Sequence, residues 1–157
     1  MFDEVKKNFG FGCMRLPMNG GEIDYAEFNK MIDTFIENGF NYFDTAHGYH
    51  SGKSETALRD CLVARYPRDK FILTNKLTQP YFNSEAEVRP FFENQLKICG
   101  VDYFDFYLMH AQSKEIFAHF KKMPRLRAGF GIQGGRKNQA FRNFIPRHGG
   151  SSRPNFE

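Results

Sequence analysis

The feature that most limits the possible folds is an alternation of short apolar segments with longer segments that carry an apolar stripe. Residues 9–16, 41–44, 71–74 and 103–109 are short and rich in aromatic or branched side chains, as expected of β-strands. The clearest apolar stripe lies between the first two of these predicted strands. Its residues recur every three or four positions, which is the spacing of one helix face. They are Tyr25, Phe28, Met31, Ile32, Phe35 and Ile36. Strands that alternate with helices favour a parallel sheet covered by helices.

Local signals predict where the helices begin and end. Asp24 and Ser84 each precede a glutamate by three residues, which predicts a capping box at the start of two helices. Gly39 is expected to take the left-handed conformation that ends the first of them. Another helix is expected over residues 54–66. Pro90 is expected in the first turn of its helix, because a proline further along removes a main-chain hydrogen bond.

The order of these elements, β-α-β-α-β-α-β, indicates a fold class. Short connections and helices of this length are typical of a (β/α) barrel. Residues 1–122 are therefore predicted to be α/β, an incomplete (β/α)8 TIM barrel of roughly the first four βα units. Residues 123–157 are predicted to be an irregular tail, because they hold 6 of the 14 glycines and 3 of the 7 prolines and show no sustained periodicity.

The net charge of +4 is distributed unevenly along the chain. Residues 123–157 hold seven Lys and Arg side chains and one acid, Glu157. Removing these from the totals of 22 basic and 18 acidic side chains leaves 15 and 17 in residues 1–122. The body is thus slightly acidic, and no nucleic-acid partner is expected for it. The Arg- and Gly-rich tail alone leaves open an RNA-binding extension.

Composition also excludes several other classes of protein. No apolar run is long enough for a transmembrane helix, and the first residues lack the apolar core of a secretory signal. Cys13, Cys61 and Cys99 are widely spaced and odd in number, so neither a disulfide framework nor a metal site is expected. The sequence predicts a cytoplasmic protein with reduced thiols and no membrane partner.

Four polar residues stand at or just after the ends of successive predicted strands. Asp44 ends the second strand, Tyr49 follows it in the loop, Lys76 follows the third strand, and His110 ends the fourth. Each of them alone is compatible with a structural or solvated role. In a barrel, however, these strand ends converge on the face where active sites are built. An ammonium group near a phenol stabilises the phenolate, which makes tyrosine a usable proton donor near neutral pH. Asp44 is expected to orient Lys76, and His110 to hydrogen-bond a carbonyl oxygen.

Three segments resemble the aldo-keto reductase family, and the resemblance extends over essentially all of residues 9–120. FDTAHGYHSGKSE (43–55) is similar to the segment around the family's catalytic Asp and Tyr, TNKL (74–77) to the strand with its Lys, and GVDYFDFYLMH (100–110) to the strand that ends in its His. The family's catalytic residues therefore correspond to Asp44, Tyr49, Lys76 and His110. The segments FGCMRLPM and YHSGKSE are most similar to bacterial members.

The resemblance implies NADPH-dependent reduction of a small aldehyde or ketone to an alcohol, in which Tyr49 protonates the carbonyl oxygen. It also implies that the nicotinamide lies near Cys13, Met14, Arg15 and Asp44. Family members bind most of the cofactor with strands five to eight, whereas residues 1–122 resemble the first four only. NADPH affinity is therefore expected to be weak or absent, and a non-catalytic truncated remnant of such an enzyme is the alternative.

A shifted reading frame offers a second explanation of the tail. Back-translation of residues 134–157 with free codon choice, read one nucleotide over, permits the string AEGKIKHFGISFHDTAEVLDQIL, which resembles the family's next segment. The codons of Lys121, Lys122 and Met123 permit a run of adenines in which a single base is easily gained. The hypothesis is that residues from about 123 onward are out of frame and disordered.

Overall fold

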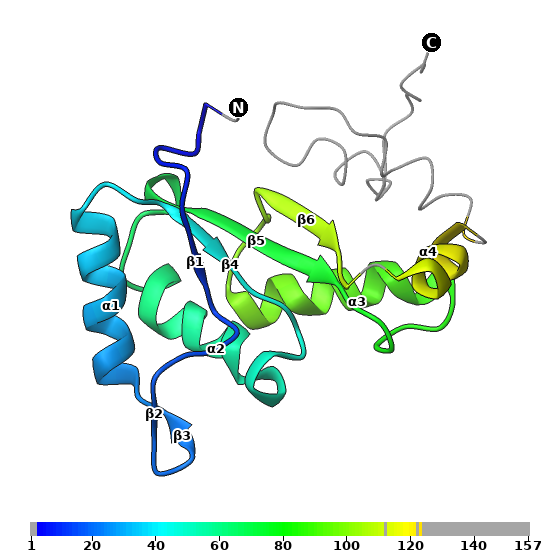
Figure 1. Ribbon diagram of the computed structural model, residues 1–157, viewed down its shortest axis with the longest axis horizontal. Coiled ribbons are helices and arrows are strands. Elements are labelled where there is room, and N and C mark those ends of the chain that lie inside the picture. Colours follow the sequence, from blue (N-terminus) through cyan, green and yellow to red (C-terminus); the bar gives the residue numbers. More distant parts are fainter. Residues whose placement is uncertain (1–2, 112, 122, 124–157) are drawn as a thin grey trace.

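The fold is a sheet of parallel strands with helices packed on one face, seen in a computed structural model that describes residues 3–111, 113–121 and 123 (Figure 1). The sheet has the strand order β1-β4-β5-β6, and all of its neighbours are parallel. Its register aligns Gly12 with Asp44, Asp44 with Thr74, and Thr74 with Phe106. The strands are β1 (Gly10–Gly12), β4 (Tyr42–Asp44), β5 (Ile72–Leu77) and β6 (Phe106–Met109).

The helices connect these strands in the predicted order. α1 (Tyr25–Glu37) joins β1 to β4, and α3 (Glu85–Cys99) joins β5 to β6. Between β4 and β5 lie a 3-10 turn, η1 (Tyr49–Gly52), then α2 (Lys53–Leu58), a π-helical turn η2 (Arg59–Val63) and a short 3-10 turn η3 (Arg68–Lys70). α4 (Lys114–Lys121) follows β6. This alternation confirms the predicted α/β class and the partial (β/α) barrel.

Two local predictions are tested at α1, and the capping box expected there is half formed, since the Asp24 N–H donates to the Pro17 carbonyl oxygen and not to the Glu27 side chain. The Asp24 carboxylate caps the helix by accepting a hydrogen bond from the Glu27 N–H at 3.0 Å. Gly39, just past the helix end, has φ of +81°, a conformation that costs glycine little and other residues about 1–2 kcal/mol.

Replacing Asp24 by alanine is expected to lower the free energy of unfolding by about 1 kcal/mol, because an N–H group of the first turn loses its acceptor. Urea unfolding followed by circular dichroism measures this change. Asp24→Asn, which keeps an acceptor oxygen, is the matched control and should lose less. Equal stability of the alanine variant and the parent protein would contradict the capping role.

Other local predictions are wrong. The helix expected over residues 54–66 is split, because α2 gives way to the π-helical turn after Leu58. Pro90 lies inside α3 and beyond its first turn, so the helix continues although one main-chain N–H donor is missing. The Ser84 side chain does not cap α3; instead the Glu87 carboxylate accepts from the Asn83 N–H and the Ser84 hydroxyl.

The chain also forms a hairpin that the sequence did not predict. β2 (Met18–Asn19) and β3 (Glu22–Ile23) pair antiparallel before α1. Gly20 and Gly21 form the turn with φ of +59° and +87°. β1 itself is shorter than the predicted strand over residues 9–16, since the chain turns after Gly12.

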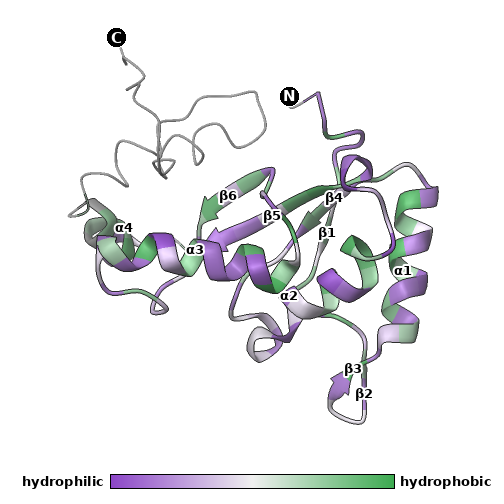
Figure 2. Ribbon diagram, turned by 180° about the vertical axis from the view of Figure 1, so that it is seen from behind, coloured by the Kyte–Doolittle hydropathy of each residue, from purple (hydrophilic) through white to green (hydrophobic). Residues whose placement is uncertain are grey.

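The core between the sheet and the helices is rich in phenylalanine. Phe43 of β4 is fully buried, and its ring lies 5.2 Å from that of Phe35 in α1 and 5.7 Å from that of Phe11 in β1. Figure 2 shows hydrophobic and hydrophilic stretches alternating along α1, and a hydrophilic stretch toward the arrowhead of β5. The apolar core therefore extends along the sheet, and it also encloses a few buried polar side chains, among them Asn75 of β5.

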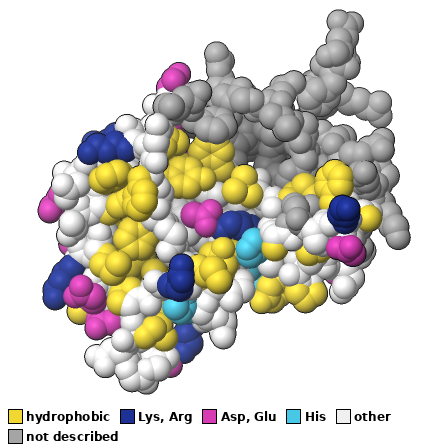
Figure 3. Space-filling view, in the orientation of Figure 1, with side chains coloured by type: hydrophobic (Ala, Val, Ile, Leu, Met, Phe, Trp, Pro, Cys, Tyr) yellow, Lys and Arg dark blue, Asp and Glu magenta, His cyan; other side chains and the backbone are white. Residues whose placement is uncertain are grey.

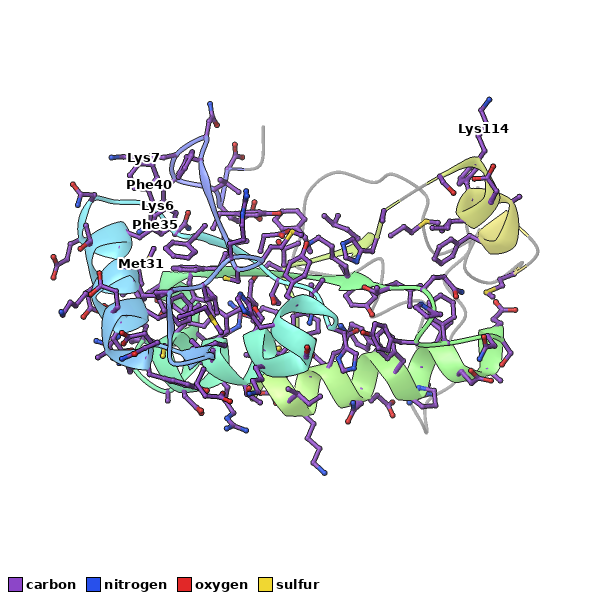
Figure 4. The ribbon with its side chains drawn as sticks, turned by 60° about the horizontal axis from the view of Figure 1, so that its bottom comes forward. Lys6, Lys7, Met31, Phe35, Phe40 and Lys114 are labelled. Atoms are coloured by element: carbon purple, nitrogen blue, oxygen red, sulfur yellow. The ribbon has the colours of Figure 1, made fainter. Side chains whose placement is uncertain are left out.

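The sheet has two open edges within the described residues, since β1 and β6 each have one strand neighbour there. A groove of about 380 Å³ lies between α1 and Phe11 of β1. Phe11, Met31, Phe35 and Phe40 provide its apolar lining. Figure 4 shows Met31, Phe35 and Phe40 together at this end of the molecule, with Lys6 and Lys7 beside them.

The predicted boundary near residue 122 is not tested by the fold. Residues 124–157, for which a disordered, out-of-frame tail is predicted, lie outside the described residues.

Candidate active site

The four residues expected to form a site lie together where the parallel strands end. Asp44 is the last residue of β4, and His110 follows β6 directly. Lys76 was expected just after a strand over residues 71–74, but β5 extends to Leu77, so Lys76 lies within the strand, one residue before its end. Tyr49 begins η1 in the loop after β4. Figure 3 shows acidic, basic and histidine side chains adjoining one another on this face, amid hydrophobic side chains.

The Lys76 ammonium is the centre of this group. Its Nζ donates to Asp44 Oδ1 at 2.5 Å, to the Thr45 carbonyl oxygen at 2.9 Å and to the Tyr49 hydroxyl at 3.2 Å. An ammonium group has three donors, so these acceptors use all of them and fix its direction. Lys76 as a whole is 8% exposed, and the Asp44 carboxylate next to it offsets the cost of burying its charge.

The Tyr49 hydroxyl also faces His110. The distance from its oxygen to His110 Nε2 is 3.5 Å, and the two rings meet edge to face with centroids 5.7 Å apart. The other ring nitrogen, Nδ1, lies 2.9 Å from the Thr78 hydroxyl, which holds the imidazole plane in place. The phenol therefore has an ammonium group on one side and an imidazole on the other.

Burial is the main reason that the pKa of His110 is lowered from its ordinary value, and the positive charge of Lys76 lowers it further. The ring is therefore neutral at pH 7. The unfolded chain binds a proton to this residue more readily than the folded one. The free energy of unfolding thus decreases as the pH falls from about 6.5 toward the lower folded-state pKa.

An NMR titration of the His110 ring is expected to give a midpoint below about 6.5 in the parent protein. In Lys76→Met the midpoint should rise, because the neighbouring positive charge is lost. Lys70→Met removes an exposed lysine elsewhere and is the control, for which no change is expected. A midpoint that is the same with and without Lys76 would contradict this electrostatic contact.

The loop that carries Tyr49 has an uncommon backbone. His50, Ser51 and Gly52 follow it with φ of +51°, +55° and +91°. The first two are not glycines, and such residues cost about 1–3 kcal/mol each and concentrate at functional sites. His50 Nε2 accepts a hydrogen bond from the Leu16 N–H at 2.9 Å, which ties this loop to the turn after β1.

The residues expected near a nicotinamide occupy that turn. The Cys13 N–H donates to the Asp44 carbonyl oxygen at 2.8 Å, and the Cys13 carbonyl accepts from the Ser54 hydroxyl at 3.0 Å. The Cys13 side chain is fully buried, and burial raises the pKa of its thiol. Met14 and Arg15 are exposed, and Asp44 is partly exposed. Of the four, Met14 and Arg15 are exposed to solvent and Asp44 is partly so, whereas the buried Cys13 anchors the turn.

Sequence reasoning missed a second polar cluster behind the site. Glu55, Asn75 and Gln95 are fully buried and hydrogen-bonded to one another, and His47 joins them. Glu55 falls on the apolar side of a helix. A carboxylate there is buried only if it has hydrogen-bonding partners, and the sequence does not identify them. No pattern in the sequence places Asn75 and Gln95 beside it.

Two features are absent from the part of the chain that the structure describes. In those residues no helix is both long and apolar enough to cross a membrane. No group of three or more His, Cys, Asp or Glu side chains among the same residues is arranged to hold a metal ion.

Comparison with solved structures finds the same fold. An aldo-keto reductase from Klebsiella pneumoniae in complex with NADPH superposes with a TM-score of 0.56 at 23% identity, over 72% of this chain and 39% of that one. The holo form of an aldo-keto reductase from Bacillus halodurans gives a TM-score of 0.55 at 26% identity, over 73% and 41%. This chain therefore corresponds to less than half of each of these (β/α) barrels.

Curated relatives agree with the structural comparison. The 4-dihydromethyl-trisporate dehydrogenase of Mucor mucedo is 36% identical over 106 residues, which are 64% of this chain and 30% of the relative. Human aldo-keto reductase family 1 member C3 is 32% identical over 104 residues, 65% of this chain and 31% of the relative. The chain spans about a third of the length of both. Because the model of the aldo/keto reductase family matches residues 8–123, more than half of the chain, the protein belongs to this family.

Proposed function

We propose that the chain carries the proton-donor site of an oxidoreductase that reduces an aldehyde or ketone to an alcohol with NADPH. The observation that supports this function most is the placement of the Tyr49 hydroxyl, 3.2 Å from the Lys76 ammonium and 3.5 Å from His110 Nε2. A phenol in that position has a group that stabilises its anion and a neutral group that can orient a carbonyl oxygen.

In the proposed mechanism Tyr49 transfers its proton to the carbonyl oxygen as negative charge develops there. The Lys76 ammonium stabilises the phenolate that remains, and Asp44 keeps that ammonium in place. The neutral His110 ring donates a hydrogen bond to the carbonyl oxygen, and Thr78 fixes the ring. When bound, NADPH supplies the hydride.

The residues on this face fit a nicotinamide. Asp44 has a side chain that is 27% exposed, beside the exposed turn of Met14 and Arg15, so a polar acceptor is available to a carboxamide group. The chain spans only 39% and 41% of the Klebsiella and Bacillus reductases. We propose that residues 3–123 hold the nicotinamide end and that affinity for NADPH is weak.

The test is consumption of NADPH, followed at the absorbance of the reduced nicotinamide, by the full chain with simple aromatic and aliphatic aldehydes. Millimolar NADPH compensates for weak affinity. We expect slow oxidation of NADPH with formation of an equal amount of alcohol. Absence of aldehyde-dependent oxidation at saturating NADPH would contradict the proposal.

A second candidate function is a barrel fragment without turnover. The observation that favours it is that β1 and β6 each have a single strand neighbour within the described residues, so the sheet is open at both edges there. The same assay separates the two candidates, because a fragment without turnover leaves NADPH unchanged at every aldehyde concentration.

We also propose that the protein acts in the cytoplasm on a small carbonyl compound, without a nucleic-acid or membrane partner. All three cysteines, Cys13, Cys61 and Cys99, are buried free thiols, which suits a reducing compartment. The predicted RNA-binding alternative concerns the tail. Its test is a salt titration of RNA binding, since phosphate contacts weaken as salt increases.

Finally, we propose that residues from about 123 onward are translated out of frame. The support is that the codons possible for residues 134–157, read one nucleotide over, can encode a string that resembles the family's next segment. Reading the coding DNA around Lys121 to Met123 tests this directly. A shifted frame that lacks fifth-strand sequence or meets early stop codons would contradict it.

A further inference from the structure

The most unusual buried group outside the four site residues is the carboxylate of Glu55 in α2. Its side chain has no exposed surface, and a carboxylate in that position is costly unless each oxygen accepts hydrogen bonds. Both oxygens do. Oε2 lies 2.7 Å from His47 Nδ1, and Oε1 accepts from Asn75 Nδ2 at 2.7 Å and from Gln95 Nε2 at 3.0 Å.

The first of these partners belongs to the loop of the proton donor. His47 stands two residues before Tyr49, between β4 and η1. Its ring meets Tyr81 edge to face with centroids 4.7 Å apart, and Phe91 with centroids 5.1 Å apart. Packing thus sets the plane of the imidazole, and the bond to Glu55 sets its position along that plane.

The second partner belongs to the strand of the ammonium group. Asn75 and Lys76 are neighbours in β5, so their side chains point to opposite faces of the sheet. Asn75 Oδ1 accepts from the Lys76 main-chain N–H at 2.8 Å and from Gln95 Nε2 at 3.0 Å. Gln95 Nε2 also lies 3.3 Å from the Lys76 carbonyl oxygen. Both main-chain groups of Lys76 are therefore held from the helix side of the sheet.

Gln95 extends the network to the next strand. Its Oε1 accepts a hydrogen bond from the Tyr107 hydroxyl, in β6, three residues before His110. Glu55 is thus the common acceptor that connects the Tyr49 loop, the Lys76 strand and, through Gln95, the strand that leads to His110.

From these contacts we propose that Glu55 is a positioning residue for the proton donor. It fixes the separation of the Tyr49 hydroxyl from the Lys76 ammonium by holding His47 with one oxygen and Asn75 with the other. A carboxylate suits this role because both of its oxygens accept, whereas a glutamine presents an acceptor at one end only. The inference rests on the proposed function for its effect on rate, but the positions of Tyr49 and Lys76 can be measured without turnover.

Two substitutions of His47 separate its hydrogen bond from its packing. His47→Phe keeps a ring against Tyr81 and Phe91 and removes the donor to Glu55. His47→Asn keeps a donor near the position of Nδ1 and removes the ring. If the hydrogen bond positions Tyr49, kcat should fall about tenfold or more in His47→Phe, with a smaller change in KM, and stay within about threefold of the parent protein in His47→Asn. The reverse order would overturn the proposal.

NMR of the full chain gives a readout that does not depend on activity. In Glu55→Gln we expect the Tyr49 ring signals and the Lys76 amide signal to change together, because both links are altered. In His47→Phe we expect the Tyr49 signals to change while the Lys76 amide stays in place. Ile32→Val, a fully buried site in α1 away from this network, is the control for a general loss of packing and should leave both signals unchanged.

The outcomes distinguish this inference from the proposed function. If the parent protein shows no turnover but the signals respond as described, the proposed function fails and the positioning role stands. If Tyr49 and Lys76 signals are unchanged in Glu55→Gln, or change equally in Ile32→Val, Glu55 does not position them. Should Glu55→Gln fail to fold, the two His47 variants still decide the link from Glu55 to Tyr49: Tyr49 ring signals that are unchanged in His47→Phe would overturn the proposal.

Discussion

Substitution of Tyr49 by phenylalanine is expected to lower kcat for aldehyde reduction by about 10²- to 10⁴-fold, the usual contribution of a general acid. The change removes one oxygen atom and keeps the ring that packs against His110 and lies 4.8 Å from Lys76 Nζ. Because the site keeps its shape, KM for the aldehyde should change much less than kcat. Stopped assays of alcohol formation, which detect slow turnover, measure the loss.

The control for this variant is Tyr25→Phe, which removes the same hydroxyl group from a tyrosine that is 40% exposed on α1. Its kcat should equal that of the parent protein. Equal thermal midpoints of the two variants would show that the loss in Tyr49→Phe is chemical. A Tyr49→Phe variant that keeps more than about a tenth of the parent activity would contradict the role of Tyr49 as proton donor.

Substitution of Lys76 by methionine is expected to cause a loss of comparable size by a different route. The phenol remains, but the group that stabilises its anion is gone, and Asp44 loses its partner at 2.5 Å. Residues that act as one unit give losses that do not add. The double variant Tyr49→Phe with Lys76→Met should therefore be no slower than the worse of the two single variants.

Lys76→Arg is the informative comparison, since it keeps the charge but replaces a compact ammonium group by a planar guanidinium. It should recover little activity, because three acceptors surround the Lys76 Nζ position at 2.5, 2.9 and 3.2 Å. Losses that multiply in the double variant would mean that Tyr49 and Lys76 contribute independently, which would contradict their action as one proton-donor unit.

The order of strands and helices and the positions of the four site residues could be predicted because they depend on periodicity and on strand ends. Asp44 and His110 lie where apolar strands stop, and parallel strands bring such positions to one edge. The cap at Asp24 was predictable for a similar reason, since it requires only a short polar side chain next to an amphipathic stripe.

Features that depend on contacts between distant segments could not be predicted. Glu55 and Gln95 are 40 positions apart, and a sequence gives no sign that one accepts a hydrogen bond from the other. The same is true of His50 and Leu16, which join the Tyr49 loop to the turn after β1. Pro90 shows the opposite case, in which tertiary packing of α3 overrides a local preference.

The reaction proposed for these side chains is hydride transfer from NADPH to a carbonyl carbon with Tyr49 as the proton donor. Its most direct test incubates the full chain with an aldehyde and NADPH that carries deuterium in both C4 positions of the nicotinamide, and determines the mass of the alcohol by mass spectrometry. We expect an alcohol with one deuterium on the former carbonyl carbon, formed by the parent protein and reduced to background in Tyr49→Phe. An unlabelled alcohol would contradict hydride transfer from NADPH, and equal labelling by Tyr49→Phe would contradict the role of Tyr49 as proton donor.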